Sequence, residues 1–383
     1  MKEPGDPDWD PMSDWVLEDQ VAAYDDMRRR CPVAYSEALG WSLFRHEDVL
    51  RALEDHETFS NAVSRHRSVP NGMDPPEHAA YRRAIEPFFD DERMQDFAPA
   101  CRRIAGGLLE SLAGRSSFDC VQDFADPFAV RCQCAFLGWP EALAERIRDW
   151  TRRNQTAALE RDGAALALLA VEFQSFIEEV LEDRRRTEVP PRSDVTTSLM
   201  ELRVNGAPLS DDELTSVLRN WTAGEVGSLA ASLGIVVHHL ALHGALQEKL
   251  RSDPSLLPAA IDEILRLSGP LVLNRRVARR DVEIGGRRIA AGERVSLIWV
   301  AANRDDRAFE AADELRLERD PRGNLLYGAG IHVCPGAPLA RLELRVALEE
   351  LLARSRQLEL SGESGRRARY PANGWASLSV RLG

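Results

Sequence analysis

The chain has 383 residues, enough to bury a large core, and its 44% hydrophobic and 29% charged residues are typical of a folded globular protein. Its 49 basic residues are outnumbered by 62 acidic ones, and the net charge of -13 excludes nucleic acid and disfavours membrane surfaces as partners, because phosphate groups need a basic footprint. Residues 1–18 are acidic and lack an apolar stretch, so we expect an N-terminal tail without signal peptide or membrane anchor, and a single cytoplasmic domain over residues 19–383.

Helical periodicity dominates the chain, and strand-like alternation is confined to short runs. Helices are expected at residues 21–30, 46–53, 77–89, 98–112, 140–154, 164–186, 211–243, 255–267 and 337–353. Strands are expected at residues 41–44, 281–289, 295–300 and 377–382. The pattern predicts a mainly α fold with small β-sheets.

The cysteines do not suggest a disulfide framework, because six in so long a chain suit a reducing compartment. Cys132 and Cys134 have no second cysteine pair or histidine cluster to complete a zinc site. We expect them to be core residues.

The longest expected helix starts at Ser210-Asp-Asp-Glu213, a capping box, and runs for about thirty residues. It is apolar on several faces, so it should cross the protein interior. It also contains Gly224 and Gly227, and a glycine inside a helix costs about 1 kcal/mol relative to alanine. A ligand or close packing is the expected reason for these glycines.

Two further motifs follow that helix. Glu263 and Arg266 are three residues apart, which places the carboxylate and the guanidinium on one helical face. Alone this spacing is typical of a surface ion pair. After a strand pattern, Arg319 precedes the segment Tyr327-Gly-Ala-Gly-Ile-His-Val-Cys-Pro-Gly336.

Cys334 in that segment is the candidate metal ligand. Gly328, Gly330 and Gly336 surround it and allow the backbone to turn tightly beside a flat ligand. The helix expected at 337–353 starts directly afterwards, and a helix N-terminus favours a thiolate over a thiol. The alternative is a buried structural cysteine in a glycine-rich turn.

The order and spacing of these motifs resemble the cytochrome P450 family, specifically its soluble bacterial members. The family's Phe-Gly-x-Gly-x-His-x-Cys-x-Gly signature matches residues 327–336, with Tyr327 in place of phenylalanine. Glu263 and Arg266 match its Glu-x-x-Arg motif, and Arg319 falls where a third member of that cluster is expected. Residues 74–82, Asp-Pro-Pro-Glu-His-Ala-Ala-Tyr-Arg, resemble its Asp-Pro-Pro-Glu-His-x-x-x-Arg.

The resemblance implies the cytochrome P450 fold, with haem b (iron protoporphyrin IX) between the long central helix and the helix after the cysteine loop. Cys334 would be the axial ligand of the iron, and Glu263, Arg266 and Arg319 would brace its loop. The other implied haem contacts are His78, Arg82, His332 and Arg276 at the propionates, Arg275 as a substitute for Arg276, and Tyr327, Gly328 and Gly336 in the loop.

The long helix departs from the family's Ala/Gly-Gly-x-Asp/Glu-Thr motif, since it reads Ala223-Gly-Glu-Val-Gly-Ser228. Val226 replaces the acid and Gly227 replaces the threonine that take part in proton delivery. Gly224, Glu225, Gly227 and Ser228 are the candidate catalytic residues. Three explanations stay open: a displaced pair of Glu225 and Ser228, water or a substrate group in the space left by Gly227, or use of peroxide. A fourth explanation is that Glu225 is a solvated charge and Ser228 a packing residue.

Polar residues near this helix suggest a polar, phenolic or carboxylate-bearing aromatic substrate. The candidate substrate contacts are Arg219, Asn220, Thr222, Ala223 and Leu273, with Arg65 and Arg67 in a loop expected to roof the pocket.

We expect a monomeric monooxygenase that inserts one oxygen atom from O2 into a small or medium organic molecule by hydroxylation or oxidative dealkylation. No flavin or iron-sulfur segment is present, so electrons would come from a separate ferredoxin and ferredoxin reductase. They would dock on the cysteine side of the haem, near Arg82, Arg83, Arg341 and Arg345. The alternatives are a peroxygenase of the same fold and a haem-binding recruitment or sensor domain without turnover.

Overall fold

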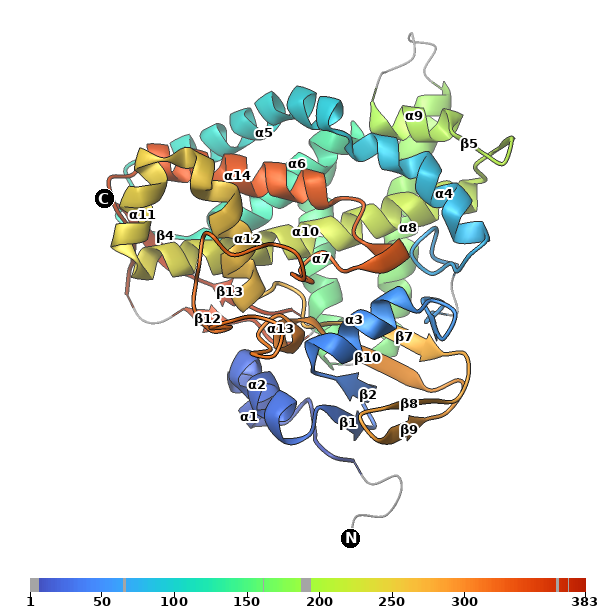
Figure 1. Ribbon diagram of the computed structural model, residues 1–383. Coiled ribbons are helices and arrows are strands. Elements are labelled where there is room, and N and C mark those ends of the chain that lie inside the picture. The colour runs from blue at the N-terminus through green and yellow to red at the C-terminus, as the bar shows by residue number, and fades with distance from the viewer. Residues whose placement is uncertain (1–6, 65–66, 161, 187–193, 363–364, 371) are drawn as a thin grey trace.

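The computed structural model describes residues 7–64, 67–160, 162–186, 194–362, 365–370 and 372–383, and helices make up most of it (Figure 1). The α-helices are α1 (Asp14–Glu18), α2 (Gln20–Arg30), α3 (His46–Glu54), α4 (Glu77–Ile85), α5 (Asp91–Leu112), α6 (Asp126–Leu137), α7 (Leu143–Glu160), α8 (Gly163–Arg186), α9 (Val195–Glu201), α10 (Asp211–Leu242), α11 (Gly244–Ser252), α12 (Leu257–Leu267), α13 (Trp299–Ala302) and α14 (Ala337–Ala353). Shorter helical turns are η1 (Glu86–Phe89), η2 (Cys120–Ala125), η3 (Pro254–Leu256) and η4 (Gly330–His332).

The strands are short and form small sheets in the described part of the chain. They are β1 (Val33–Ser36), β2 (Gly40–Leu43), β3 (Phe59–Ser60), β4 (Phe118–Asp119), β5 (Arg203–Val204), β6 (Ala207–Pro208), β7 (Leu273–Ala278), β8 (Val282–Ile284), β9 (Arg287–Ile289), β10 (Arg294–Ile298), β11 (Leu358–Leu360), β12 (Arg366–Arg367), β13 (Trp375–Ser377) and β14 (Ser379–Leu382). The largest sheet has the order β1-β2-β10-β7-β3, with β2 and β10 parallel and its other pairs antiparallel. The prediction of a mainly α fold with small sheets is confirmed.

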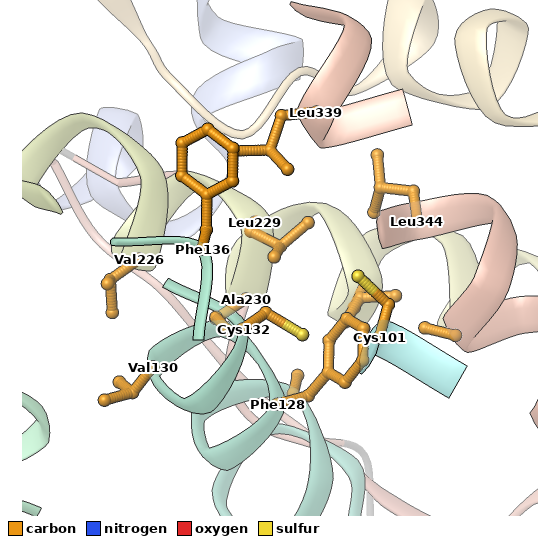
Figure 2. Close-up of a cluster of buried hydrophobic side chains, with 14 of the residues drawn as sticks. Cys101, Phe128, Val130, Cys132, Phe136, Val226, Leu229, Ala230, Leu339 and Leu344 are labelled. Carbon is orange, nitrogen blue, oxygen red and sulfur yellow. The ribbon is translucent and has the colours of Figure 1, made fainter. Parts of the chain in front are cut away.

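The core lies where α10 crosses the molecule between α5, α6 and α14 (Figure 1). Ser210 and Glu213 form the expected capping box at the start of α10. By length and composition α10 could cross a membrane, but most of its apolar window is buried inside the protein. Figure 2 shows part of this core: Leu229 on α10 and Leu344 on α14 lie in one apolar cluster with side chains of α5 and α6.

The described part of the segment expected as a tail packs against the domain. The Trp9 ring lies 5.3 Å from the Phe44 ring and 6.2 Å from the Tyr24 ring, centroid to centroid. Val16 in α1 is fully buried. Apolar residues among the acids therefore fold this segment onto α2 and β1, although its composition suggested a tail.

The helices α1, α6, α9, α11 and α13 were not expected from the sequence, and α5 begins earlier than expected; for α6 and α5 the physical reason is clear. α6 was not predicted because it is buried almost all round, so it shows no alternation between an apolar and a polar face. α5 starts seven residues before the expected 98, because the Asp90 side chain caps it and Pro99 is accommodated inside it.

Candidate functional site

The cysteine loop holds its shape through backbone contacts that require glycine. The Cys334 amide donates to the Tyr327 carbonyl over 2.8 Å. Gly330 has φ +67°, and a Cβ there would come within 2.5 Å of the Leu53 carbonyl oxygen. α14 begins three residues after Cys334. The loop presents Cys334 to a cavity of about 420 Å³ that Gly328 and Gly336 also line.

An ion-pair cluster supports this loop from behind. Arg266 is fully buried and donates to both carboxylate oxygens of Glu263, over 2.8 and 2.9 Å. Arg319 donates to the same carboxylate over 2.7 Å. Arg266 also donates to the carbonyl oxygens of Asn303 and Ala312, each over 2.7 Å. These bonds tie α12 to the chain that leads into the cysteine loop.

Nitrogen donors gather at one end of the cavity. The rings of His78 and His332 lie 4.3 Å apart, and Arg82 and the 2%-exposed Arg276 line the same space. Burial, followed by the nearby His78 and Arg276, lowers the pKa of His332 to about 3, and its Nε2 meets no partner in the described part of the protein. Arg82 pairs with Glu86 over 2.9 Å, but no carboxylate lies within 4.0 Å of His78, Arg276 or His332 in the described part of the protein, and this excess of donors calls for an anionic ligand.

Haem meets this requirement, because its two propionates would supply the anions for these donors and Cys334 would be a ligand of its iron. The neighbouring Arg275 does not take part. Its guanidinium donates to the Tyr370 hydroxyl over 2.8 Å, because successive side chains of β7 point to opposite faces. Arg276 therefore faces the cavity, and Arg275 does not take its place.

Opposing effects act on the thiol of Cys334. Burial and then the Glu225 charge raise the pKa of the thiol to about 11, against the opposing effect of the Gly336 and Ala337 amides. The amides at the start of α14 thus lower the pKa of the thiol, as expected, but burial has the larger effect. Binding of a cation favours a deprotonated thiol.

α10 presents two faces to two different cavities. Gly224, Glu225 and Ser228 line the cysteine cavity, whereas Gly227 lines a second one. The Ser228 hydroxyl donates to the Gly224 carbonyl over 2.7 Å. Its partners are backbone carbonyls of its own helix, so the expected pairing with the Glu225 carboxylate is wrong.

Glu225 instead faces Glu343 on α14, which is fully buried. Neither oxygen of Glu343 meets an N–H or O–H donor from any other described residue. Burial raises the pKa of Glu225, and burial followed by the Glu225 charge raises the pKa of Glu343. Two carboxyl groups close together in an apolar interior favour the protonated, neutral form of at least one of them.

Sequence reasoning missed this acid pair, although Glu343 occupies a position that the apolar pattern of residues 337–353 marks as buried. The thiols of Cys101 and Cys132 also lie there: their sulfur atoms and a Glu343 oxygen are all within 4.8 Å of one another. Figure 2 shows both cysteines between α5, α6 and α10, surrounded by apolar side chains. The expectation that Cys132 is a core residue agrees with this placement.

The structure corrects most of the expected substrate contacts. Asn220 lines the cysteine cavity, but its amide nitrogen donates to Ser68 and Val69 and so holds the preceding loop. Arg67 pairs with Glu77 and Glu213 over 2.7 and 3.2 Å.

The other described residues that were expected to contact the substrate do not line the cysteine cavity either. Thr222 is buried and accepts a hydrogen bond from Gln133 over 3.2 Å. The residues that line neither cavity are Arg67, Arg219, Thr222, Ala223 and Leu273, whereas Arg65 lies outside the described residues.

The second cavity has a volume of about 740 Å³ and lies between α7, α10 and the C-terminal residues 366–376. Its lining arginines are Arg148, Arg152, Arg366, Arg367 and Arg369. Sequence reasoning did not find them, because they come from segments about 200 residues apart and no local motif joins them.

Comparison with known proteins agrees with this site. A family model described as cytochrome P450 matches residues 159–367. A putative cytochrome P450, YjiB of Bacillus subtilis, is 31% identical over 86% of this chain and 86% of its own. Nocardicin C N-oxygenase of Nocardia uniformis is 34% identical over 92% of both chains.

Solved structures agree as well. Epothilone D-bound cytochrome P450epoK superposes with a TM-score of 0.89 and 28% identity over 98% of this chain and 99% of that chain. A mutant of P450 EryK with erythromycin B has a TM-score of 0.86 and 30% identity over 97% of both chains. These similarities agree with the cysteine loop, the ion-pair cluster behind it and the donor cluster. The chain belongs to the cytochrome P450 family and is a haem-dependent monooxygenase that acts on a small molecule with O2.

Proposed function

We propose that this monooxygenase inserts one oxygen atom from O2 into a small or medium organic substrate by hydroxylation or oxidative dealkylation. The observation that carries the proposal is the single cavity onto which Cys334, the four propionate donors and α10 all open. Haem bound at Cys334 supplies the redox chemistry of oxygen activation. Among relatives, names such as cyclomarin C epoxidase and mycinamicin IV hydroxylase/epoxidase support oxygen insertion.

The chain's own residues would bind the cofactor and handle protons. His78, Arg82, Arg276 and His332 would hold the propionates and thereby orient the ring against Cys334. Glu225 would hold a proton at its carboxyl group, at the wall of the cavity, with Glu343 as the partner that keeps that proton available. This arrangement would replace the acid and the threonine that Val226 and Gly227 displace.

Two measurements test the proposal. The reduced enzyme with carbon monoxide should absorb at the position typical of thiolate ligation, and Cys334→Ser should lose that band. The enzyme should then form oxygenated product with O2, a ferredoxin and its reductase. Product formed at the same rate with peroxide alone would favour the peroxygenase, and the absence of product from either system would favour a sensor or recruitment domain.

The natural electron donor is proposed to be a separate ferredoxin in the cytoplasm. Of the arginines expected to form its docking surface, Arg341 pairs with Asp262 over 2.9 Å and Arg345 with Glu349 over 2.9 Å. Arg83 has no carboxylate within 4.0 Å in the described part of the chain, so its charge is uncompensated. Arg83→Glu should slow haem reduction by an acidic ferredoxin, and an unchanged rate would remove this docking surface.

A further inference from the structure

We propose that the second cavity is the substrate site and that it selects an organic carboxylate. The carboxylate would lie at Arg366, Arg367 and Arg369, and the apolar body would lie along α10 toward Gly227. This inference rests on the proposed function, because it names the substrate class of the same enzyme.

The lining of the second cavity is strongly basic. The cavity is lined by five arginines, Arg148, Arg152, Arg366, Arg367 and Arg369, against two acids, Glu18 and Asp126. The chain as a whole carries a net charge of -13, so a basic lining runs against its average. A positive recess on an acidic protein concentrates small anions.

The arginines from the C-terminal segment are also free to bind. On α7, Arg152 is paired with Asp149 over 2.8 Å, and Arg148 donates to the Gln122 carbonyl. Within the described residues, by contrast, no carboxylate lies within 4.0 Å of Arg366, Arg367 or Arg369. A guanidinium without a partner can bind a carboxylate through two parallel hydrogen bonds.

The remaining walls suit the apolar part of a ligand. Val226, Ala230 and Ala231 contribute one face of α10, and Leu159 comes from α7. The Trp375 ring continues this surface toward the arginines and carries the Arg367 guanidinium 4.5 Å from its centroid. A cavity of about 740 Å³ with apolar walls and polar groups at one end has the size of a small-molecule site, not of a macromolecular interface.

The position of Gly227 connects this cavity to the chemistry. Gly224 and Ser228 line the cysteine cavity, while Gly227 between them lines the second one, so the same turn of α10 is a wall of both. A Cβ on Gly227 would come within 3.2 Å of the Gln155 amide nitrogen on α7. The missing side chain therefore leaves space between α10 and α7, on the wall of the second cavity that is nearest to the cysteine cavity along α10, and the proposed ligand would extend from the arginines to this wall.

The test uses the haem-loaded enzyme and matched ligand pairs. The probes are ω-phenylalkanoates, from phenylacetate to 6-phenylhexanoate, and the corresponding primary amides. Equilibrium dialysis measures binding, and the ferric Soret band reports arrival near the iron. At least one carboxylate should bind about tenfold more tightly than its amide, and its affinity should fall as KCl is raised.

Variants localise the effect. Arg366→Gln/Arg369→Gln should weaken carboxylate binding about tenfold and leave amide binding unchanged, because both side chains are exposed and the fold does not depend on them. The control is Arg381→Gln, an exposed arginine on β14 outside the cavity, which should change neither. Equal binding of acid and amide, no binding by any carboxylate, or an unaffected double variant would overturn the carboxylate site.

The outcomes separate this inference from the proposed function. Carboxylate binding that never shifts the Soret band would overturn the substrate assignment. Loss of the carbon monoxide band typical of thiolate ligation would sink the proposed function, while dialysis would still decide whether the cavity binds the anion.

Discussion

At the scale of single residues, Glu225 and Glu343 bring two carboxyl groups together inside the protein. Each carboxyl group is removed from water, and ionising both would bring two like charges together in a medium that screens them poorly. Protonation of one of the two groups avoids most of that cost. The arrangement lowers the stability of the folded protein, and it favours a protonated carboxyl group at the wall of the haem cavity.

The raised pKa values of Glu225 and Glu343 predict a protonated carboxyl group that infrared spectroscopy should detect. At pH 7 the enzyme is expected to show the C=O band of a protonated carboxyl group that shifts in D2O, and Glu225→Gln/Glu343→Gln should remove it. Glu110→Gln, an exposed acid on α5, is the control and should leave the band in place. A band that survives the double variant would assign the proton elsewhere.

The same pair should make stability depend on pH. Both folded pKa values are raised above the ordinary 4.5, so the unfolded chain loses its protons first and stability falls as the pH rises above 4.5. Glu343→Gln should therefore gain stability relative to the native enzyme at pH 8 more than at pH 5. Urea unfolding at the two values measures the difference, and an equal effect at both would contradict it.

At the scale of elements, the cysteine loop depends on α12 through the Glu263 carboxylate. Removing that charge leaves Arg266 fully buried without its counter-ion, and breaking a buried pair costs about 3–5 kcal/mol. Glu263→Gln should lower the melting temperature and the haem content of the purified protein. Glu310→Gln removes an exposed partner of Arg316 and should change neither. Full haem content in Glu263→Gln would show that the loop holds without this brace.

α10 gives up helix stability at Gly227. Alanine in a helix interior is about 0.5–1 kcal/mol more favourable than glycine, and among the described residues the added methyl group would come close only to the flexible end of Gln155. Gly227→Ala should thus raise the melting temperature, and Gly227→Ala/Gln155→Ala should raise it as much or more. A lower melting temperature in both variants would show that the helix cannot accept a side chain there.

At the scale of the whole molecule, histidines join α10 to the C-terminal sheet and make the fold sensitive to acid. The pKa of His238 is lowered to about 4, mainly by burial and then by the charges of Arg367 and His243. The pKa of His239 is also lowered to about 4, by burial and then by His243 and His238. The unfolded chain takes up these protons near pH 6.5, so stability should fall as the pH drops from 6.5 toward 4. His238→Gln should flatten this part of the urea-unfolding profile, and an unchanged slope would exclude His238.

The sequence alone determined what depends on neighbouring residues. The segment 327–336, the pair Glu263 and Arg266, and the capping box of α10 could be read directly, because their spacing follows from one turn or one helix. Most helices were predicted for the same reason, since one of their faces meets water.

Tertiary structure decided what depends on segments that meet only after folding. α6 has no polar face to show its period, Glu225 turns to Glu343 on α14 and not to Ser228, and the arginines of the second cavity join α7 to residues 366–369. Periodicity records which side of an element is apolar, but not which element covers it. The sequence was therefore enough to identify the family. The protonation of the Glu225 and Glu343 pair and the charge of the second cavity arise from contacts between residues more than 100 positions apart.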